Sequence, residues 1–240
     1  MKVGIKVGCC GFPRSKKEYF QHFKLVEVQQ TFYKMPRPET ALRWREEAPP
    51  DFEFSLKASQ IITHPVTSPT YRKAGLEIKP GKEGQYGFFR PSDEVFRAWE
   101  QTARFALVLN ARAIVFQCPP NFHESDENIK HLSIFFKKIK GSGFLFIWEP
   151  RGKWKEKTIL NLCRDLSLIH CVDPFQNESL HGQPLYYRLH GGKGYRHQYS
   201  EQELEWLKAK MKNKEAYLLF NNISMYQDAL AFQRLLDESP

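Results

Sequence analysis

The sequence of 240 residues contains no apolar run of the roughly 20 residues that a helix needs to span a bilayer. Its N-terminal apolar stretch is short and is interrupted by Lys6, unlike the hydrophobic region of a secretory signal. Cysteines number only five, and an odd count without a leader favours a reducing compartment. No two cysteines have CxxC spacing, which argues against a structural zinc site. We therefore expect a cytoplasmic protein without a membrane partner.

The composition is that of an ordinary globular protein, with 41% hydrophobic and 26% charged residues. The length suits one domain over residues 1–240, because an α/β barrel commonly needs roughly 250 residues. A net charge of +9 attracts phosphates, nucleic acid or other anions, although a solvated basic surface is the preferred explanation. The lysines are scattered and form no basic tail, which weakens the nucleic-acid interpretation.

Short β-rich runs alternate with helical patterns, and the runs number eight, as a closed (β/α)8 TIM barrel requires. The expected strands are Val3–Cys9, Leu25–Thr31, Phe52–Lys57, Ala113–Gln117, Phe144–Glu149, Leu168–Asp173, Leu185–His190 and Ala216–Asn221. The expected helices are Lys16–Phe23, Glu39–Glu47, Asp93–Asn110, Ser125–Ile139, Trp154–Leu166, Ser200–Lys212 and Ser224–Leu236. Ser92 is an expected N-cap, and Ser200 with Glu203 has capping-box spacing.

Two connections are irregular. The segment Pro174–Pro184, between the sixth and seventh strands, shows no good helix. The segment Gln60–Pro91, after the third strand, is rich in proline, glycine, lysine and tyrosine, and it is too long for an ordinary connection. We interpret it as a lid over the barrel mouth, with local disorder as an equal alternative.

Strand alternation places polar side chains inside the expected barrel. In the seventh strand Tyr186, Arg188 and His190 share one face, and in the third Ser55 and Lys57 do. In the second strand, the corresponding set is Glu27, Gln29 and Thr31. The polar strand ends are Glu27, Gln29, Lys57, Gln117, Glu149, Asp173, Arg188, His190 and Asn221. They converge on one mouth in a parallel barrel, either as a ligand site or as an ion-pair network that satisfies itself.

Several blocks together resemble one family, the domain of unknown function 72 family, also called YecE-like. The blocks are VGCCGFP, VEVQQTFYKMP, FEFSLKASQIITHP, VFQCPPNF, WEPRGKW, YYRLHG and FNN, and they span nearly the whole chain. The resemblance implies a TIM barrel and no established activity. This chain departs from the family pattern where Gly8–Phe12 replaces GTSGW, and where Gln29 replaces an asparagine.

Four residues are candidates for catalysis. Glu149 is a candidate general acid or base, working with Asp173 or His190, although it equally suits a structural pair with Lys57 or Arg188. Lys57 could form a Schiff base if burial lowered its pKa. Nearby carboxylates would instead keep it charged, so we predict an electrostatic role.

The remaining candidates are predicted to contact the substrate. The loop of Gly191, Gly192 and Lys193, beside Asn221, predicts an anion cradle, with a flexible glycine turn as the alternative. The other predicted contacts are Glu27, Gln29, Tyr33, His64, Gln117, Arg151, Arg188 and Tyr195. Glu27, Glu149, Asp173 and His190 are also a ligand set for a divalent metal, but Lys57, Arg151 and Arg188 already supply positive charge, so no metal or other cofactor is assigned.

These residues favour an enzyme, such as a hydrolase, lyase or isomerase, that acts on a small phosphate- or carboxylate-bearing substrate by general acid/base chemistry. A nucleic-acid enzyme or binder, suggested by the basic charge, is the first alternative. A non-catalytic barrel that binds a ligand is the second.

Overall fold

The computed structural model describes residues 4–78, 80–192 and 194–238. In this part of the chain, eight parallel strands pair in sequence order and close into a barrel, because β8 pairs with β1. The strands are β1 (Ile5–Cys10), β2 (Leu25–Val28), β3 (Glu53–Lys57), β4 (Ala111–Gln117), β5 (Leu145–Glu149), β6 (Leu168–Val172), β7 (Leu185–Leu189) and β8 (Ala216–Phe220). The predicted (β/α)8 barrel is confirmed, although Val3, placed in the first strand, lies outside the described residues.

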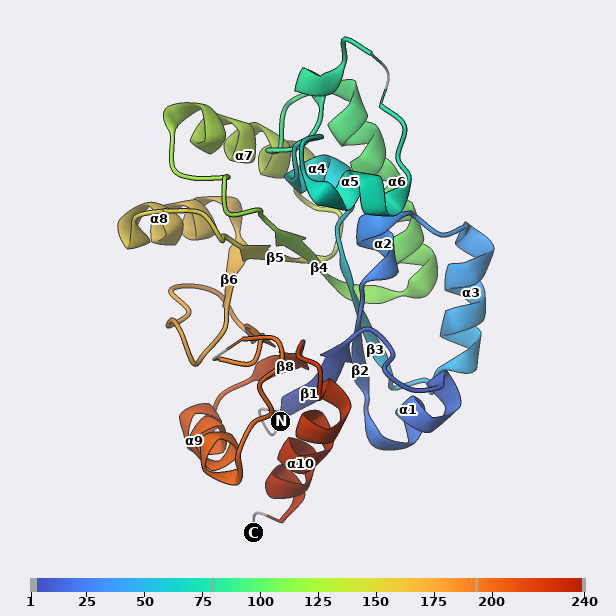
Figure 1. Cartoon of the computed structure of the whole chain (residues 1–240), viewed down its shortest axis with the longest axis vertical. Coiled ribbons are helices and arrows are strands. Elements are labelled where there is room, and N and C mark those ends of the chain that lie inside the picture. Colours follow the sequence, from blue (N-terminus) through green and yellow to red (C-terminus); the bar gives the residue numbers. More distant parts are fainter. Residues whose placement is uncertain (1–3, 79, 193, 239–240) are drawn as a thin grey trace.

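Helices surround the strands (Figure 1). They are α1 (Lys16–His22), α2 (Gln30–Tyr33), α3 (Pro38–Glu47), α4 (Gln60–Thr63), α5 (Pro69–Ala74), α6 (Asp93–Leu109), α7 (Asp126–Ile139), α8 (Glu156–Leu166), α9 (Glu201–Met211) and α10 (Met225–Asp237), with a 3-10 turn at Glu83–Gln85. The predicted caps are confirmed: Ser92 Oγ accepts the Val95 N–H at 3.3 Å, and Ser200 and Glu203 form a capping box. Among the described helices, none has the length and apolar character of a membrane span.

Alternation along the strands separates two apolar cores. The inner core fills the barrel with Cys10, Leu25, Ala113, Val115, Ile147, Ile169, Cys171, Tyr186, Tyr217 and Leu219. The outer core joins strands to helices and includes Tyr187 and Leu189 of β7. The predicted alternation of β7 is therefore confirmed. It sends Arg188 into the barrel, where small inner residues such as Cys10 and Ala113 leave room for long polar side chains.

The second strand is shorter than predicted. β2 ends at Val28, whereas the expected strand continued to Thr31, and the chain turns at once into α2. Thr31 Oγ1 donates to the backbone oxygen of Lys57 at 2.7 Å, which ties α2 to the end of β3. Gln29 precedes α2 in helical backbone geometry and does not continue the alternation from Glu27. The strand prediction failed here because its end is set by a contact with a distant segment.

The segment after β3 is folded and is not a lid. It contains α4, which packs against α6, and α5, which packs against α2, on the outside of the barrel (Figure 1). Its end is anchored by Phe89, a fully buried ring 5.3 Å from that of Phe135 on α7. None of its described residues lines the cavity at the barrel mouth. Burial of Phe89 and Tyr71 explains why a segment of loop-like composition is ordered.

The connection from β6 to β7 has no helix among its residues, as predicted. It is held by polar contacts to β6: Ser179 Oγ donates to the His170 oxygen at 2.8 Å, and the His170 N–H donates to the His181 oxygen at 2.9 Å. An irregular segment anchored in this way can place its polar residues at the barrel mouth.

Candidate functional site

A polar cavity of about 970 Å³ opens at the C-terminal ends of the strands. This is the end at which barrels of this type carry their chemistry. Most predicted site residues line it: Gln29, Tyr33, Lys57, Gln117, Glu149, Arg151, Asp173, Arg188, His190, Gly192, Tyr195 and Asn221. Gln176 and Asn177 line it too, from the irregular connection after β6, where no strand or helix pattern marks them.

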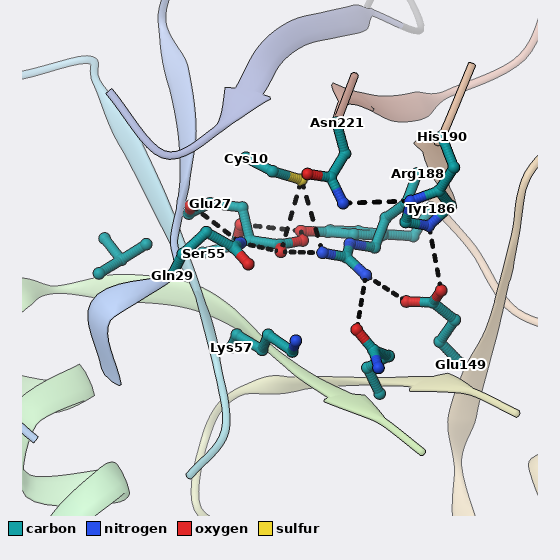
Figure 2. A network of polar contacts seen from close by, with 12 residues as sticks. Cys10, Glu27, Gln29, Ser55, Lys57, Glu149, Tyr186, Arg188, His190 and Asn221 are labelled. Atoms are coloured by element: carbon teal, nitrogen blue, oxygen red, sulfur yellow. Dashed lines mark hydrogen bonds and ion pairs between the residues drawn. The ribbon is translucent and has the colours of Figure 1, made fainter. Parts of the chain in front are cut away.

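Arg188 lies at the centre of the site, with a side chain only 1% exposed. Its Nη2 is 3.0 Å from Oε1 of Glu27, and its Nη1 donates to Oε2 of Glu149. One guanidinium therefore bridges carboxylates from β2 and β5 across the barrel (Figure 2). Nη2 also approaches Cys10 Sγ at 3.7 Å, while Nε has no partner among the described residues. The pair of Glu149 with Arg188, the structural alternative raised by the sequence, is present.

Glu27 lies beneath the cavity and is fully buried. Tyr186 donates its hydroxyl to Oε2 at 2.9 Å, and Gln29 donates its amide to Oε1. Ser55 Oγ lies 2.8 Å from the Tyr186 hydroxyl and extends the network. The predicted contact of Glu27 with substrate is therefore wrong, because protein groups surround its carboxylate. Cys10 was missed, and Ser55, which alternation places inside the barrel, was not among the predicted site residues. Both pair in register with Glu27 across neighbouring strands.

Glu149 is held as an anion. Arg151 donates from Nε to its Oε1 at 2.8 Å, and Arg188 binds Oε2. Burial opposes ionisation, but the two guanidinium groups outweigh it and hold the pKa of the carboxyl well below its usual range. A carboxylate of low pKa is a poor proton acceptor, so the geometry favours an orienting role over the predicted acid/base role.

His190 contributes an imidazole side chain to the cavity lining. Its side chain is 25% exposed, with Nε2 3.2 Å from Oε1 of Glu149 and Nδ1 3.1 Å from Nδ2 of Asn221. When the Asn221 amide donates to Nδ1, the ring proton lies on Nε2 and faces Glu149. Arg151 Nη2, which can only donate, lies 3.0 Å from the same nitrogen, and it binds the ring when Nε2 carries no proton. The ring is thus oriented on both sides, as a general acid or base requires.

Asp173 joins the backbone segments that follow β6 and β7. Its Oδ2 accepts the N–H of His190 at 2.9 Å, and its Oδ1 accepts the N–H of Phe175 at 3.0 Å. Both oxygens are occupied by chain segments that follow β6 and β7. These contacts indicate that Asp173 positions His190, whereas the sequence suggested acid/base work.

Lys57 is the basic side chain lining the cavity that makes no ion pair within the described residues. It is 7% exposed, and its Nζ makes no hydrogen bond or ion pair within residues 4–78, 80–192 and 194–238. Nζ lies 3.6 Å from the centre of the Phe32 ring. Burial first, and then the charge of Arg188, lowers the pKa of the ammonium to about 7, against the opposing effect of Glu149. The carboxylate partners expected for Lys57 are not available to it, because Arg188 already pairs with Glu27 and Glu149.

The glycine loop after β7 is a tight turn. The Gly191 N–H donates to the Tyr199 hydroxyl at 2.8 Å, and the Gly194 N–H donates to the Gly191 oxygen at 2.9 Å. Gly191 does not line the cavity, and its N–H is not available to an anion, which favours the turn over the predicted cradle. Gly192 does line the cavity, and Lys193 lies outside the described residues.

His64 belongs to the segment behind the site. It is 5% exposed and absent from the cavity lining, with Nδ1 2.8 Å from Thr63 Oγ1 and its ring 4.9 Å from that of Phe32. Burial lowers its pKa to about 3. The predicted substrate contact is therefore wrong, and His64 is a neutral packing residue.

The proposed metal ligands do not form a cluster. In the described part of the chain, no group of three His, Cys, Asp or Glu residues is arranged to hold a metal. Glu27 and Glu149 face the Arg188 guanidinium, and both Asp173 oxygens accept backbone N–H groups. The residues at the mouth thus suit an anion better than a cation.

The fold and this cavity define a TIM barrel with a polar site at its C-terminal mouth. The chain belongs to the family described as "Protein of unknown function DUF72", whose match covers residues 13–240. It is 25% identical to the UPF0759 protein YunF of Bacillus subtilis (strain 168), over 86% of this chain and 79% of that protein. It is 46% identical to the UPF0759 protein YecE of Escherichia coli (strain K12) over 50 residues, so the match spans only 18% of that protein.

Solved structures share the fold. A DUF72 family protein from Enterococcus faecalis V583 superposes with a TM-score of 0.70 at 21% identity, over 98% of both chains. A D-tagatose 3-epimerase-like protein reaches 0.52 at 14% identity, over 97% of this chain and 96% of that chain. A D-psicose 3-epimerase reaches 0.52 at 11% identity, over 93% and 85%. At these identities the likeness concerns the barrel architecture alone.

Proposed function

We propose that the protein is an enzyme that binds a small phosphate- or carboxylate-bearing substrate at the barrel mouth and moves a proton with His190. The supporting observation is the unpaired Nζ of Lys57, which lines the cavity next to a network whose carboxylates are already neutralised. A bound anion would give Lys57 the partner that it lacks. Arg151, which also lines the cavity and has a 36% exposed side chain, supplies a second cation.

Proton transfer is assigned to His190. Glu149 and Asn221 contact its two ring nitrogens, and Asp173 holds its backbone N–H. This arrangement is that of a histidine oriented by a carboxylate that itself stays ionised. The mixed set of cations and one oriented imidazole supports acid/base chemistry next to a bound anion.

The test is ligand-dependent thermal stabilisation with inorganic phosphate, carboxylates and sugar phosphates. A ligand at 100 times its Kd stabilises the folded state by about 2.7 kcal/mol, which is readily measured as a rise in Tm. We expect Lys57→Met and Arg151→Gln each to weaken the best anion about tenfold or more. Lys138→Met is the matched control, because Lys138 also lies over an aromatic ring, 3.8 Å from the centre of Phe96, but on the surface.

Two outcomes would contradict the proposal: no anion raises the Tm, or both cavity variants bind the best anion as the unmodified protein does. Binding of an anion without turnover would favour the non-catalytic alternative.

The nucleic-acid alternative rests on the net charge of +9 and on the exposed rings of Tyr33 and Tyr195 at the cavity rim. The lysine- and tyrosine-rich segment Gln60–Pro91, which would have added basic and aromatic groups to such a site, does not line the cavity among its described residues. Its test is binding of single-stranded and duplex oligonucleotides over a salt series, because binding to a phosphate backbone must weaken steeply as salt rises.

A further inference from the structure

Lys57 is held rigidly with its amine facing the cavity. Its backbone oxygen accepts from Thr31 Oγ1 at 2.7 Å, and the following residue, Ala58, donates to the Val115 oxygen at 2.9 Å. Phe32 covers the amine on one side, with the ring centre 3.6 Å from Nζ. Figure 2 shows Lys57 beside the Arg188 network, with no dashed line joining it to that network. A fixed amine with one covered side and one open side is placed to meet a ligand from a defined direction.

The arrangement also keeps this amine free of hydrogen-bond acceptors. The carboxylates of Glu27 and Glu149 are the anions near it, and both are bound by Arg188. Burial and the Arg188 charge bring its pKa to about 7, so a large share of the amine is unprotonated at neutral pH. An unprotonated amine has a free electron pair and can act as a nucleophile. An ordinary surface lysine is almost entirely protonated at this pH.

Resting on the function proposed above, we propose that the substrate carries an aldehyde or ketone and that Lys57 bonds to it as an imine. The amine nitrogen adds to the carbonyl carbon, the C–O bond breaks, and the oxygen leaves as water with the two amine hydrogens. Protonation of the imine nitrogen restores one positive charge at this position, where the anionic part of the substrate is the counter-charge. The substrate class is therefore an aldehyde or ketone that bears a carboxylate or phosphate.

The imine defines the next step for His190. A protonated imine withdraws electrons from the neighbouring carbon and acidifies a C–H bond there. His190 lines the same cavity with an oriented ring, so it is placed to take up or return that proton. The electron pair of the broken C–H bond moves into a carbon–carbon double bond with the former carbonyl carbon, and the imine nitrogen becomes neutral.

The test traps the imine in the full-length protein. Pyruvate, glyoxylate and glycolaldehyde phosphate are each added at pH 7 with cyanoborohydride, which donates hydride to the imine carbon. Trapping adds the mass of the carbonyl compound less one oxygen atom, and peptide mass spectrometry locates it. We expect Lys57 to be labelled about tenfold or more faster than any other lysine, because so much more of it is unprotonated.

Lys57→Met and Lys57→Arg should lose this label, whereas Lys138→Met should keep it. Lactate, an anion of similar size without a ketone, distinguishes the two proposals: it should stabilise the protein but leave no label. Labelling of Lys57 no faster than of surface lysines, with all three carbonyl compounds, would overturn the imine. If anions still raised the Tm in that case, the function proposed above would stand without it. If no label formed and no anion of either panel raised the Tm, both proposals would fail.

Discussion

Charged side chains at the two ends of the barrel differ in burial and in pairing. At the N-terminal end, Lys6 pairs with Glu53, whose other oxygen accepts the Tyr217 hydroxyl at 2.6 Å. The lysine and carboxylate side chains are 42% and 27% exposed, so each charge has both a partner and water. At the C-terminal end, Arg188 is 1% exposed, and Lys57 is 7% exposed without a charged partner.

This difference separates a structural ion pair from a candidate ligand site. A partly exposed pair contributes little to stability, and it also needs nothing from outside the protein. A buried cation without a partner destabilises the fold, and it persists where a ligand or a reaction makes use of it. The buried, unpaired Lys57 is therefore the feature that distinguishes the mouth of the barrel from its N-terminal end.

The largest effect should come from removing the central cation at the mouth. Arg188→Met leaves Glu27 and Glu149 buried without it, and we expect the free energy of unfolding to fall by about 3–5 kcal/mol. Urea unfolding at pH 7 measures this change. Arg151→Met is the control, since Arg151 also pairs with Glu149 but is 36% exposed, and it should cost about 1 kcal/mol or less. Equal losses of the free energy of unfolding in the two variants would contradict the proposed difference between the buried Arg188 and the partly exposed Arg151.

The next effect should have the opposite sign. We expect Lys57→Met to raise the free energy of unfolding at pH 7 by an amount on the order of 1–4 kcal/mol, because it removes a buried, unpaired ammonium. Urea unfolding of both proteins without ligand measures the difference. A variant less stable than the unmodified protein would mean that Lys57 is a structural residue.

The same pair of proteins should differ in pH dependence. The pKa of Lys57 is about 7 in the folded state against an ordinary 10.5, so the unfolded chain binds more protons between these values. The stability of the unmodified protein should therefore rise with pH through this range, relative to Lys57→Met, and the difference should be full below pH 7 and small near pH 10. Arg188 and Arg151 favour the neutral amine, and Glu149 and Glu27 oppose it. A difference independent of pH would contradict the assignment.

The smallest effect should come from the opposite end of the barrel. Lys6→Met removes the partly exposed partner of Glu53, and we expect a loss of under about 1 kcal/mol that salt reduces further. Urea unfolding at two salt concentrations measures it. A loss comparable with that of Arg188→Met would show that the two ends do not differ as described.

Sequence reasoning found the barrel and most of the residues around the cavity, because both follow from local alternation. Arg188 on the inward face of β7, and His190 directly after that strand, could be predicted from a period of two and a parallel barrel alone. It failed where distant segments meet: β2 stops at Val28 as α2 docks on the end of β3, and burial of Phe89 orders the supposed lid. His64 was predicted to contact the substrate because it follows the third strand closely in sequence, but its side chain is buried behind the site.

The sequence by itself determined the order and number of the strands, and which side chains point into the barrel, since these depend on local pattern. The tertiary structure alone decided which charges find partners there. Arg188 reaches across the barrel to Glu27 and Glu149, and the same contacts leave Lys57 unpaired in a buried position. Partner choice and pKa depend on distances and desolvation between chain segments, and these exist only once the barrel has closed.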